Sequence, residues 1–308
     1  MTILQIFAAD ERPEPDPDGA AIAAVLPDFA AAVAAVDGVA PFNEATMLRP
    51  EERRAFSVVR EAELPDSGRR ARLLVGLALA QRLDDGELEA ELAVHPTARG
   101  AGVADELLDG LERAAGGAPV TVWAHGDLPA ARVFAANRGY ALVRTLLVLA
   151  KPLDDALPEP APAPGTRIRA FDPERDADAW LALNARVFAD HPEQGRLRRA
   201  DLDDRMAQPW FDAGDFLVLV DDDERMIGYN WCKVAGGEHE IYVVGVDPDA
   251  AGAGHGRTLM DAGLRRLRER GGDEAVLYVD GGNERAVALY RRLGFVDRAR
   301  DAQYRGPR

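Results

Sequence analysis

The sequence has a single cysteine, no long apolar run and no excess of positive charge. Cys232 has no partner for an internal disulfide, and its apolar neighbours favour a packed thiol over a nucleophile. No stretch reaches the roughly 20 apolar residues that cross a bilayer, and the amino terminus lacks a secretory signal pattern. The formal net charge of -16 argues against a nucleic-acid partner. We expect a cytoplasmic monomer with no membrane or nucleic-acid partner and no metal.

The length and one proline-rich segment indicate two domains. A chain of 308 residues, 47% of them hydrophobic and 29% charged, is long enough for two globular cores. Residues 151–166 carry five prolines among small and acidic residues, which is typical of a stiff, extended linker. The predicted organisation is an amino-terminal domain over residues 1–151, a linker over 152–166 and a carboxy-terminal domain over 167–308.

The two halves follow the same order of elements. In the first half the patterns predict strands at 72–80 and 86–94, a glycine turn and helix at 99–115, a strand at 120–125, a helix at 128–138 and a strand through 149. In the second half, strands at 216–220 and 226–234 precede residues 240–295, which read as strand, glycine turn, helix, strand and helix. Gly254 follows Gly102 by 152 positions, and Gly294 follows Gly139 by 155. This steady offset favours a duplication over a fusion of unrelated pieces.

The glycine turn of the second half suits a phosphorylated ligand. Gly252, Gly254 and Gly256 remove side chains where the first amides of a helix are free, so a pyrophosphate can approach the backbone closely. A plain tight turn is the alternative for glycines taken alone. The order of the whole segment, from the strand before this turn to the helix that starts at Asn283, is more specific.

That order resembles the acetyl-CoA core of the GNAT N-acetyltransferase superfamily. The resemblance rests on Glu-Ile-Tyr-Val-Val-Gly-Val-Asp-Pro at 240–248, Gly-Ala-Gly-His-Gly at 252–256 and the helix from Asn283 to Phe295. It implies an α/β fold of two tandem GNAT domains, each a mixed, mostly antiparallel twisted sheet flanked by helices. It also implies acetyl-CoA as co-substrate.

The resemblance assigns a set of residues in each half to acetyl-CoA. In the first half these are Leu92, Ala93, Val94, Gly100, Ala101, Gly102, Val103, Ala104 and Asp105. In the second half they are Val244, Gly245, Val246, Ala251, Gly252, Ala253, Gly254, His255, Gly256, Arg257, Asn283, Glu284, Arg285, Ala286, Val287 and Ala288. The second-half loop departs from the family pattern at Ala251, where Gln or Arg is usual, so one side-chain donor is missing. The first-half loop, opened by Arg99, matches the pattern better.

Chemistry is expected in the second half only. Its polar positions Glu240, Asn283 and Tyr290 correspond by the offsets above to Leu88, Leu128 and Ala135. A one-residue strand slip would restore a carboxylate from Glu87 or Glu89. No slip restores the tyrosine. We therefore expect the first half to bind the cofactor without catalysis.

Glu240 is the candidate general base. Transfer of an acetyl group from a thioester to an amine needs a neutral amine, and a carboxylate on this strand can accept its proton directly or through one water. Alternation along the strand places Tyr242 on the same face. The alternative is a solvated carboxylate paired with Lys233 across the hairpin. His239 is a rival base, but its position faces the other side.

Tyr290 is the candidate general acid. It lies seven residues after Asn283, so the two share one helix face. Asn283 also suits a helix N-cap, and Tyr290 also suits the core. In the GNAT family the asparagine contacts the cofactor and the tyrosine protonates the leaving thiolate. Backbone amides near Val246 are expected to polarise the thioester carbonyl.

The flanking residues suggest the acceptor. His-Pro-Glu-Gln-Gly at 191–195 and Trp-Cys-Lys-Val at 231–234 resemble tandem GNAT enzymes that acetylate the cysteinyl amine of cysteinyl-glucosaminyl-inositol. The acceptor contacts implied by this resemblance are Glu44, Glu193, Lys233, Glu240 and Tyr278. Packing is favoured over sugar stacking for Trp210 and Trp231. Two other functions stay open: acetylation of another polar amine or peptide terminus, and a non-catalytic acetyl-CoA-binding module.

Overall fold

The computed structural model describes residues 19–63, 70–154, 156–189 and 194–307. Contacts divide the chain into two compact units. Unit 1 comprises residues 1–146, 280–282 and 299–308, and unit 2 comprises 147–279 and 283–298. The units do not coincide with the predicted domains: residues 147–151 fall in unit 2 and residues 280–282 in unit 1. Residues 299–308 belong with unit 1, and the proline-rich segment belongs with unit 2.

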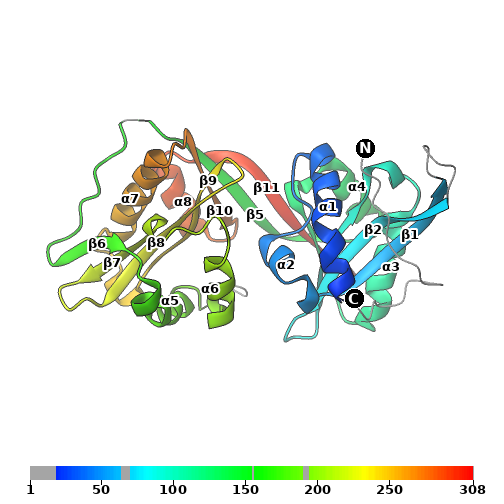
Figure 1. Cartoon of the computed structure of the whole chain (residues 1–308), viewed down its shortest axis with the longest axis horizontal. Helices are drawn as coiled ribbons and strands as arrows, with labels where there is room; N and C mark the ends of the chain where they lie inside the picture. The colour runs from blue at the N-terminus through cyan, green and yellow to red at the C-terminus, as the bar shows by residue number, and fades with distance from the viewer. Residues whose placement is uncertain (1–18, 64–69, 155, 190–193, 308) are drawn as a thin grey trace. The chain divides into compact units, whose positions relative to one another are not determined.

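Unit 1 has helices on both faces of its part of the sheet (Figure 1). Its helices are α1 (Gly19–Asp37), α2 (Glu44–Leu48), α3 (Val103–Ala115) and α4 (Pro129–Asn137). Its strands are β1 (Arg54–Glu63), β2 (Arg70–Arg82), β3 (Leu88–Val94) and β4 (Val120–Ala124), with parts of β5 (Ala141–Pro152) and β11 (Val296–Arg305). The strand order is β1-β2-β3-β4-β11, and only β3 and β4 pair in parallel among the registers described for these strands.

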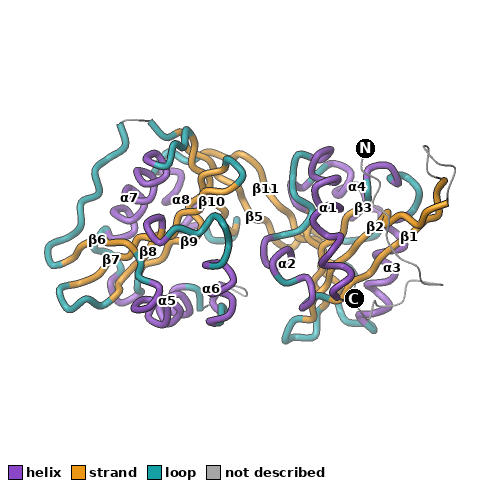
Figure 2. The backbone as a smooth tube through the Cα atoms, in the orientation of Figure 1, coloured by secondary structure: helices purple, strands orange, loops and turns teal. Residues whose placement is uncertain are grey.

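Unit 2 repeats this plan. Its helices are α5 (Pro173–Val187), α6 (Arg199–Met206), α7 (His255–Glu269) and α8 (Glu284–Arg292). Its strands β6 (Thr166–Ala170), β7 (Phe216–Asp221), β8 (Met226–Ala235), β9 (Glu238–Val246) and β10 (Glu274–Asp280) take the order β10-β9-β8-β7-β6. β6 to β9 are antiparallel, and β9 and β10 are parallel. Figure 2 marks the helices and strands of both units along the backbone. The predicted fold class, mixed and mostly antiparallel sheets flanked by helices, is confirmed.

Helix packing follows the spacing of apolar residues. In α3, Val103, Leu107, Leu108, Leu111 and Ala115 recur at helical spacing and are all buried against the sheet. Each fully buried leucine of this kind contributes about 2 kcal/mol of transfer free energy. The same face of α7 buries Leu259, Met260 and Leu264 in unit 2. These helices hold the glycine loops that precede them against the ends of β3 and β9.

The proline-rich segment runs along α7. Between the end of β5 at Pro152 and the start of β6 at Thr166, none of its described residues is in a helix or strand, but the Thr258 hydroxyl donates to the Ala161 carbonyl at 3.0 Å. Arg265 donates to the carbonyl of Leu157, also at 3.0 Å, and the Leu157 side chain is buried. The segment is therefore a packed strap on unit 2 and not a free tether.

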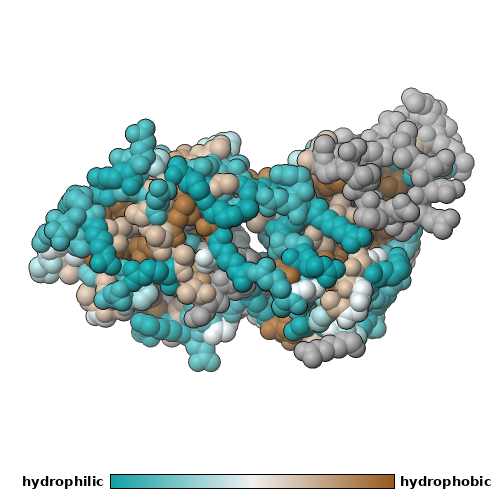
Figure 3. Space-filling view, turned by 90° about the horizontal axis from the view of Figure 1, so that it is seen from below, coloured by the Kyte–Doolittle hydropathy of each residue, from teal (hydrophilic) through white to brown (hydrophobic). Residues whose placement is uncertain are grey.

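The face drawn in Figure 3 is mostly hydrophilic, with hydrophobic residues in smaller areas. None of the helices in the described ranges is long and apolar enough to cross a membrane.

Candidate active site

A two-glycine turn sets the register of the candidate site in unit 2. Gly236 and Gly237 join β8 to β9 with φ angles of 58° and 83°, which side chains would disfavour. The resulting hairpin pairs Lys233 directly with Glu240. Opposite charges at facing positions attract each other across the strands. The hairpin therefore brings a carboxylate and an ammonium group to one face of the sheet.

A β-bulge at Tyr242 shapes the next part of β9. Trp231 pairs with Val243 and Cys232 with Ile241, so Tyr242 has no facing residue on β8. Ile241 packs in the core cluster beneath α7, whereas Tyr242 packs in the cluster around Trp231 on the other face. Glu240, on the opposite side of the strand from Ile241, thus shares a face with Tyr242.

The parallel pairing of β9 with β10 is short. Both strands are fully described, and their register covers Glu240–Val276 and Ile241–Leu277. The residues from Val244 to Val246 lie beyond these pairs. These residues pair with β8 on one side, so only their backbone groups toward β10 need other partners, and an extended pantetheine arm offers the amide groups to supply them.

Gly245 brings the backbone close to a buried ring. A Cβ atom at this position would lie 2.8 Å from the Tyr229 ring, so a side chain would force the ring or strand to shift. The Tyr229 hydroxyl donates to Oδ1 of Asn184 at 2.8 Å, which fixes the ring. At the end of the strand, buried Asp247 forms ion pairs with Arg186 and Arg225. These contacts anchor the segment predicted to bind pantetheine.

The glycine loop of unit 2, residues 251–257, fits a pyrophosphate. Gly252 and Gly254 have φ angles of 96° and 82°, and a Cβ atom on either would meet nothing within 4 Å. Their conformation therefore requires glycine, and the space beside them is open. The first turn of α7 carries no acidic residue, so the positive end of the helix dipole is not neutralised there. Buried Nδ1 of His255 has no hydrogen-bond partner within the described residues.

Tyr290 lies on α8, and Asn283 immediately precedes this helix. Asn283 accepts a hydrogen bond from the Ala286 amide at 3.1 Å, so it caps the helix. Tyr290 packs beside Phe295 with ring centroids 6.0 Å apart. Burial raises the pKa of Tyr290 to about 12, so the phenol keeps its proton at neutral pH. A proton donor to a thiolate needs this property.

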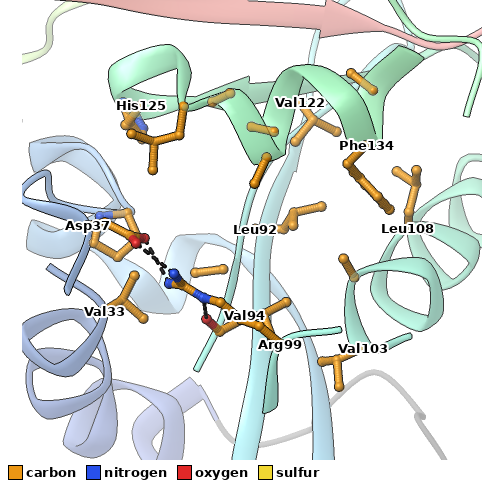
Figure 4. A pocket seen from close by; sticks show the side chains of 18 of the residues that line it. Val33, Asp37, Leu92, Val94, Arg99, Val103, Leu108, Val122, His125 and Phe134 are labelled. Atoms are coloured by element: carbon orange, nitrogen blue, oxygen red, sulfur yellow. Dashed lines mark hydrogen bonds and ion pairs between the residues drawn. The ribbon is translucent and has the colours of Figure 1, made fainter. Parts of the chain in front are cut away.

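Unit 1 contains a pocket of about 450 Å³ at the corresponding place. The first-half residues predicted to bind acetyl-CoA line it, except Ala101: Leu92, Ala93, Val94, Gly100, Gly102, Val103, Ala104 and Asp105. Figure 4 shows apolar side chains such as Phe134 around the space, with the Arg99 guanidinium bound to Asp37 at its edge. The two guanidinium nitrogens Nη1 and Nη2 of Arg99 donate to Oδ1 and Oδ2 of Asp37 at 2.7 and 2.9 Å.

The carboxylate of unit 1 that corresponds to Glu240 is Glu89, and the predicted correspondence with Leu88 is wrong. The β2–β3 pairing runs from Gly76–Val94 to Arg82–Leu88 without a shift, whereas β9 carries the bulge. Because Tyr242 is an extra residue in β9, every β9 residue before it corresponds to a β3 residue one position later than the constant offset of 152 predicts. Leu88 accordingly packs under α3. The one-residue slip considered from the sequence therefore occurs, and it aligns Glu89 with Glu240.

Glu89 is already bound on both oxygens. Gln81 donates to Oε1 at 2.9 Å, and Trp123 and Gln303 donate to Oε2 at 3.2 and 2.6 Å. A carboxylate held by these donors is poorly placed to take a proton from a substrate. Ala135, at the position of Tyr290, is buried and lines the pocket.

His125 of unit 1 is a buried cation and not a substitute base. Its Nε2 lies 2.5 Å from Glu91 Oε1, and its Nδ1 lies 3.0 Å from Asp301 Oδ2. Burial alone would lower the pKa of His125, but the hydrogen bonds and charges of Asp301 and Glu91 outweigh this and raise the pKa to about 10. Both ring nitrogens therefore carry protons at neutral pH.

The remaining predicted residues are placed as follows. Glu44 begins α2 in unit 1, and Tyr278 on β10 is 44% exposed. Glu193 lies outside the described residues. Burial raises the pKa of Cys232, which agrees with a packed thiol. Among the residues described, no group of three or more His, Cys, Asp or Glu is arranged to hold a metal ion.

Sequence reasoning did not single out Arg205. Its Nε donates to the Tyr242 hydroxyl at 2.8 Å, although α6 and β9 are far apart in the chain. For Trp210 the sequence indicates packing or sugar stacking and no contact with a lysine. It lies beside Lys233, whose Nζ is 4.8 Å from the centre of the Trp210 ring. The local sequence around either residue carries no signal for these contacts.

Comparisons with known proteins identify the family of this chain. The Acetyltransferase (GNAT) family model matches residues 180–295. The chain is 46% identical to a mycothiol acetyltransferase of Clavibacter michiganensis subsp. michiganensis over 95% of this chain and 97% of the relative. It is 44% identical to a mycothiol acetyltransferase of Salinispora arenicola over 87% of each chain.

Solved structures support the fold. A GCN5-related N-acetyltransferase from Sphaerobacter thermophilus matches with a TM-score of 0.65 and 23% identity over 94% of this chain and 95% of that one. A tandem GNAT protein from the clavulanic acid biosynthesis pathway matches with a TM-score of 0.66 and 18% identity over 96% and 98%. With relatives more than 40% identical over most of its length, the chain belongs to the mycothiol acetyltransferase family of GNAT enzymes.

Proposed function

We propose that this chain transfers the acetyl group of acetyl-CoA to the cysteinyl amine of cysteinyl-glucosaminyl-inositol, which yields mycothiol. The observation that carries the proposal is the position of Glu240. It lies in the first described pair of the short β9–β10 register, opposite Lys233, and shares a face with Tyr242. The extensive identity to mycothiol acetyltransferases supports the choice of acceptor.

Each reacting group has a proposed role. Glu240 accepts the proton of the acceptor ammonium, so the amine can attack the thioester carbonyl. Backbone amides near Val246 stabilise the charge that develops on the carbonyl oxygen. Tyr290 donates its proton to the departing thiolate. Lys233, Tyr278, Glu44 and Glu193 contact the acceptor.

The glycine loop and α8 hold the cofactor. The amides from Ala251 to Arg257 bind the pyrophosphate at the start of α7, and Val244, Gly245 and Val246 pair with the pantetheine arm. The first turn of α8, from Asn283 to Ala288, completes this site. Because Ala251 supplies no side-chain donor, the backbone carries most of the anion binding. We further propose that the enzyme works as a cytoplasmic monomer without a metal.

A product assay tests the acceptor. Purified protein with acetyl-CoA and cysteinyl-glucosaminyl-inositol is expected to give a product heavier by one acetyl group, with the acetyl on nitrogen. Mass spectrometry with fragmentation is the appropriate readout, because the acceptor's own thiol disturbs assays of released coenzyme A. Equal or faster acetylation of an aminoglycoside or a peptide terminus in competition would contradict the proposed acceptor. No turnover with any amine would favour a binding module.

Unit 1 is proposed to bind a second acetyl-CoA without turning it over. Ala131→Trp places an indole in the unit 1 pocket that Ala131 lines, so calorimetric stoichiometry is expected to fall from about two acetyl-CoA per chain to about one. Ala136→Trp, at an exposed position on the same helix, is the matched control and should keep the original stoichiometry. One site per chain in the unaltered protein would contradict this role for unit 1.

A further inference from the structure

Two aromatic rings flank the ammonium of Lys233. Its Nζ lies 4.8 Å from the ring centre of Trp210 and 5.0 Å from that of Tyr242. Both distances are within the range of cation–π attraction. The rings are 5.4 Å apart and inclined at 62°, so they meet the charge from two directions. We call Trp210, Tyr242 and Arg205 the lysine cage.

The lysine cage is held by buried neighbours. Trp231, which is fully buried, contacts both Trp210 and Tyr242 at centroid distances of 5.8 and 5.2 Å. On its outer side, the Tyr242 hydroxyl accepts a bond from Arg205, whose second nitrogen donates to the Asp201 carbonyl at 2.8 Å. The bulge at Tyr242 turns this ring onto the face of Lys233.

A lysine at this position is unusual for this chain. Lys151 and Lys233 are the only lysines among 37 lysines and arginines. An ammonium is a compact charge with three donors on a flexible stem, whereas guanidinium is a flat fork. Ordering such a stem costs rotamer entropy when the side chain is otherwise mobile. The two rings restrict this stem before any ligand binds, because they attract the ammonium.

We propose that the lysine cage positions Lys233 as a fixed hydroxyl-binding donor for the acceptor. This inference rests on the proposed function, because it concerns recognition of a polyhydroxylated amine at the same site. Lys233 and Glu240 face each other across β8 and β9, so the site offers a donor and an acceptor at a fixed spacing. Sugar and inositol hydroxyls can use both. Trp210, Tyr242 and Arg205 are positioning residues in this scheme.

Steady-state kinetics test the role in recognition. Trp210→Leu is expected to raise KM for cysteinyl-glucosaminyl-inositol about tenfold, while kcat and KM for acetyl-CoA stay within about twofold. Trp210→Phe keeps an aromatic face and should recover most of the loss. In a Lys233→Met background, Trp210→Leu should add less than about twofold, because there is no charge left to position. Lys151→Met is the matched control and should leave acceptor KM unchanged.

Spectroscopy tests the cage without any acceptor. With ¹³C-labelled lysine, the chain gives signals from two residues, and the ε-methylene protons of Lys233 should be shifted upfield by the rings. Trp210→Leu should remove much of that shift and leave Lys151 unchanged. A random-coil shift at Lys233 would overturn the cage itself.

The outcomes separate this inference from the proposed function. Normal turnover with an unchanged acceptor KM in Trp210→Leu, or an equal loss in the Lys233→Met background, would overturn the positioning role alone. Failure of the unaltered enzyme to acetylate the acceptor would overturn the proposed function and the recognition role together.

Discussion

Tyr290→Phe is expected to lower kcat at least about 100-fold, because it removes the proposed proton donor to the thiolate. The substitution deletes one hydroxyl and keeps the ring beside Phe295, so packing is preserved. Since burial raises the Tyr290 pKa to about 12, deprotonation of this phenol should not limit kcat of the unaltered enzyme up to about pH 10. Product mass over time gives kcat.

Two controls separate chemistry from folding in this variant. Thermal unfolding should change little, and the affinity for acetyl-CoA should stay near that of the unaltered protein. If kcat stays within about threefold of the original, solvent protonates the thiolate and the assignment of Tyr290 is wrong.

Glu240→Gln is expected to lower kcat/KM for the acceptor by about 100- to 1000-fold at neutral pH, because glutamine cannot take the ammonium proton. The defect should shrink as pH rises through the α-amino pKa of roughly 8, since the amine then arrives already neutral. A pH–rate profile from pH 6 to 10 measures both effects. A defect of constant size across this range would argue that Glu240 binds the acceptor and is not the base.

Glu238→Gln provides the matched control for that experiment. Glu238 lies two residues earlier on the same strand, and its carboxylate pairs with Arg298 at 3.0 Å. Removing it should change kcat/KM by less than about threefold, because a surface ion pair contributes little. Equal losses in Glu238→Gln and Glu240→Gln would point to a general effect of charge on β9.

Local sequence patterns predicted the elements that carry the site. The helix expected at 128–138 is α4, and the strands expected at 216–220 and 226–234 are β7 and β8, each within a residue or two. These elements have strong periodicity and clear glycine boundaries, such as Gly139. The glycine loops were also predictable, because positive φ at Gly254 and Gly102 follows from the same motif.

Features that depend on distant contacts could not be predicted. The bulge at Tyr242 arises where β9 packs against Trp231 and α6, and nothing in the alternation of residues 240–246 marks it. Without the bulge, the correspondence between the halves is displaced by one residue, so that Glu240 is aligned with Leu88 instead of Glu89. The pairing of β11 with β4 joins residues about 180 positions apart, and periodicity carries no information about such partners.

That last pairing constrains the order of events during synthesis. Residues 302–305 form the strand beside β4, and Asp301 holds the His125 imidazolium. Until these last residues are synthesised, the edge of β4 that pairs with β11 stays uncovered. In the same period His125 has Glu91 as a partner but lacks Asp301. Exposed edges invite pairing with other chains. A cut in the proline-rich segment would therefore not give two complete domains, because residues 302–305 at the end of the chain complete the sheet of unit 1.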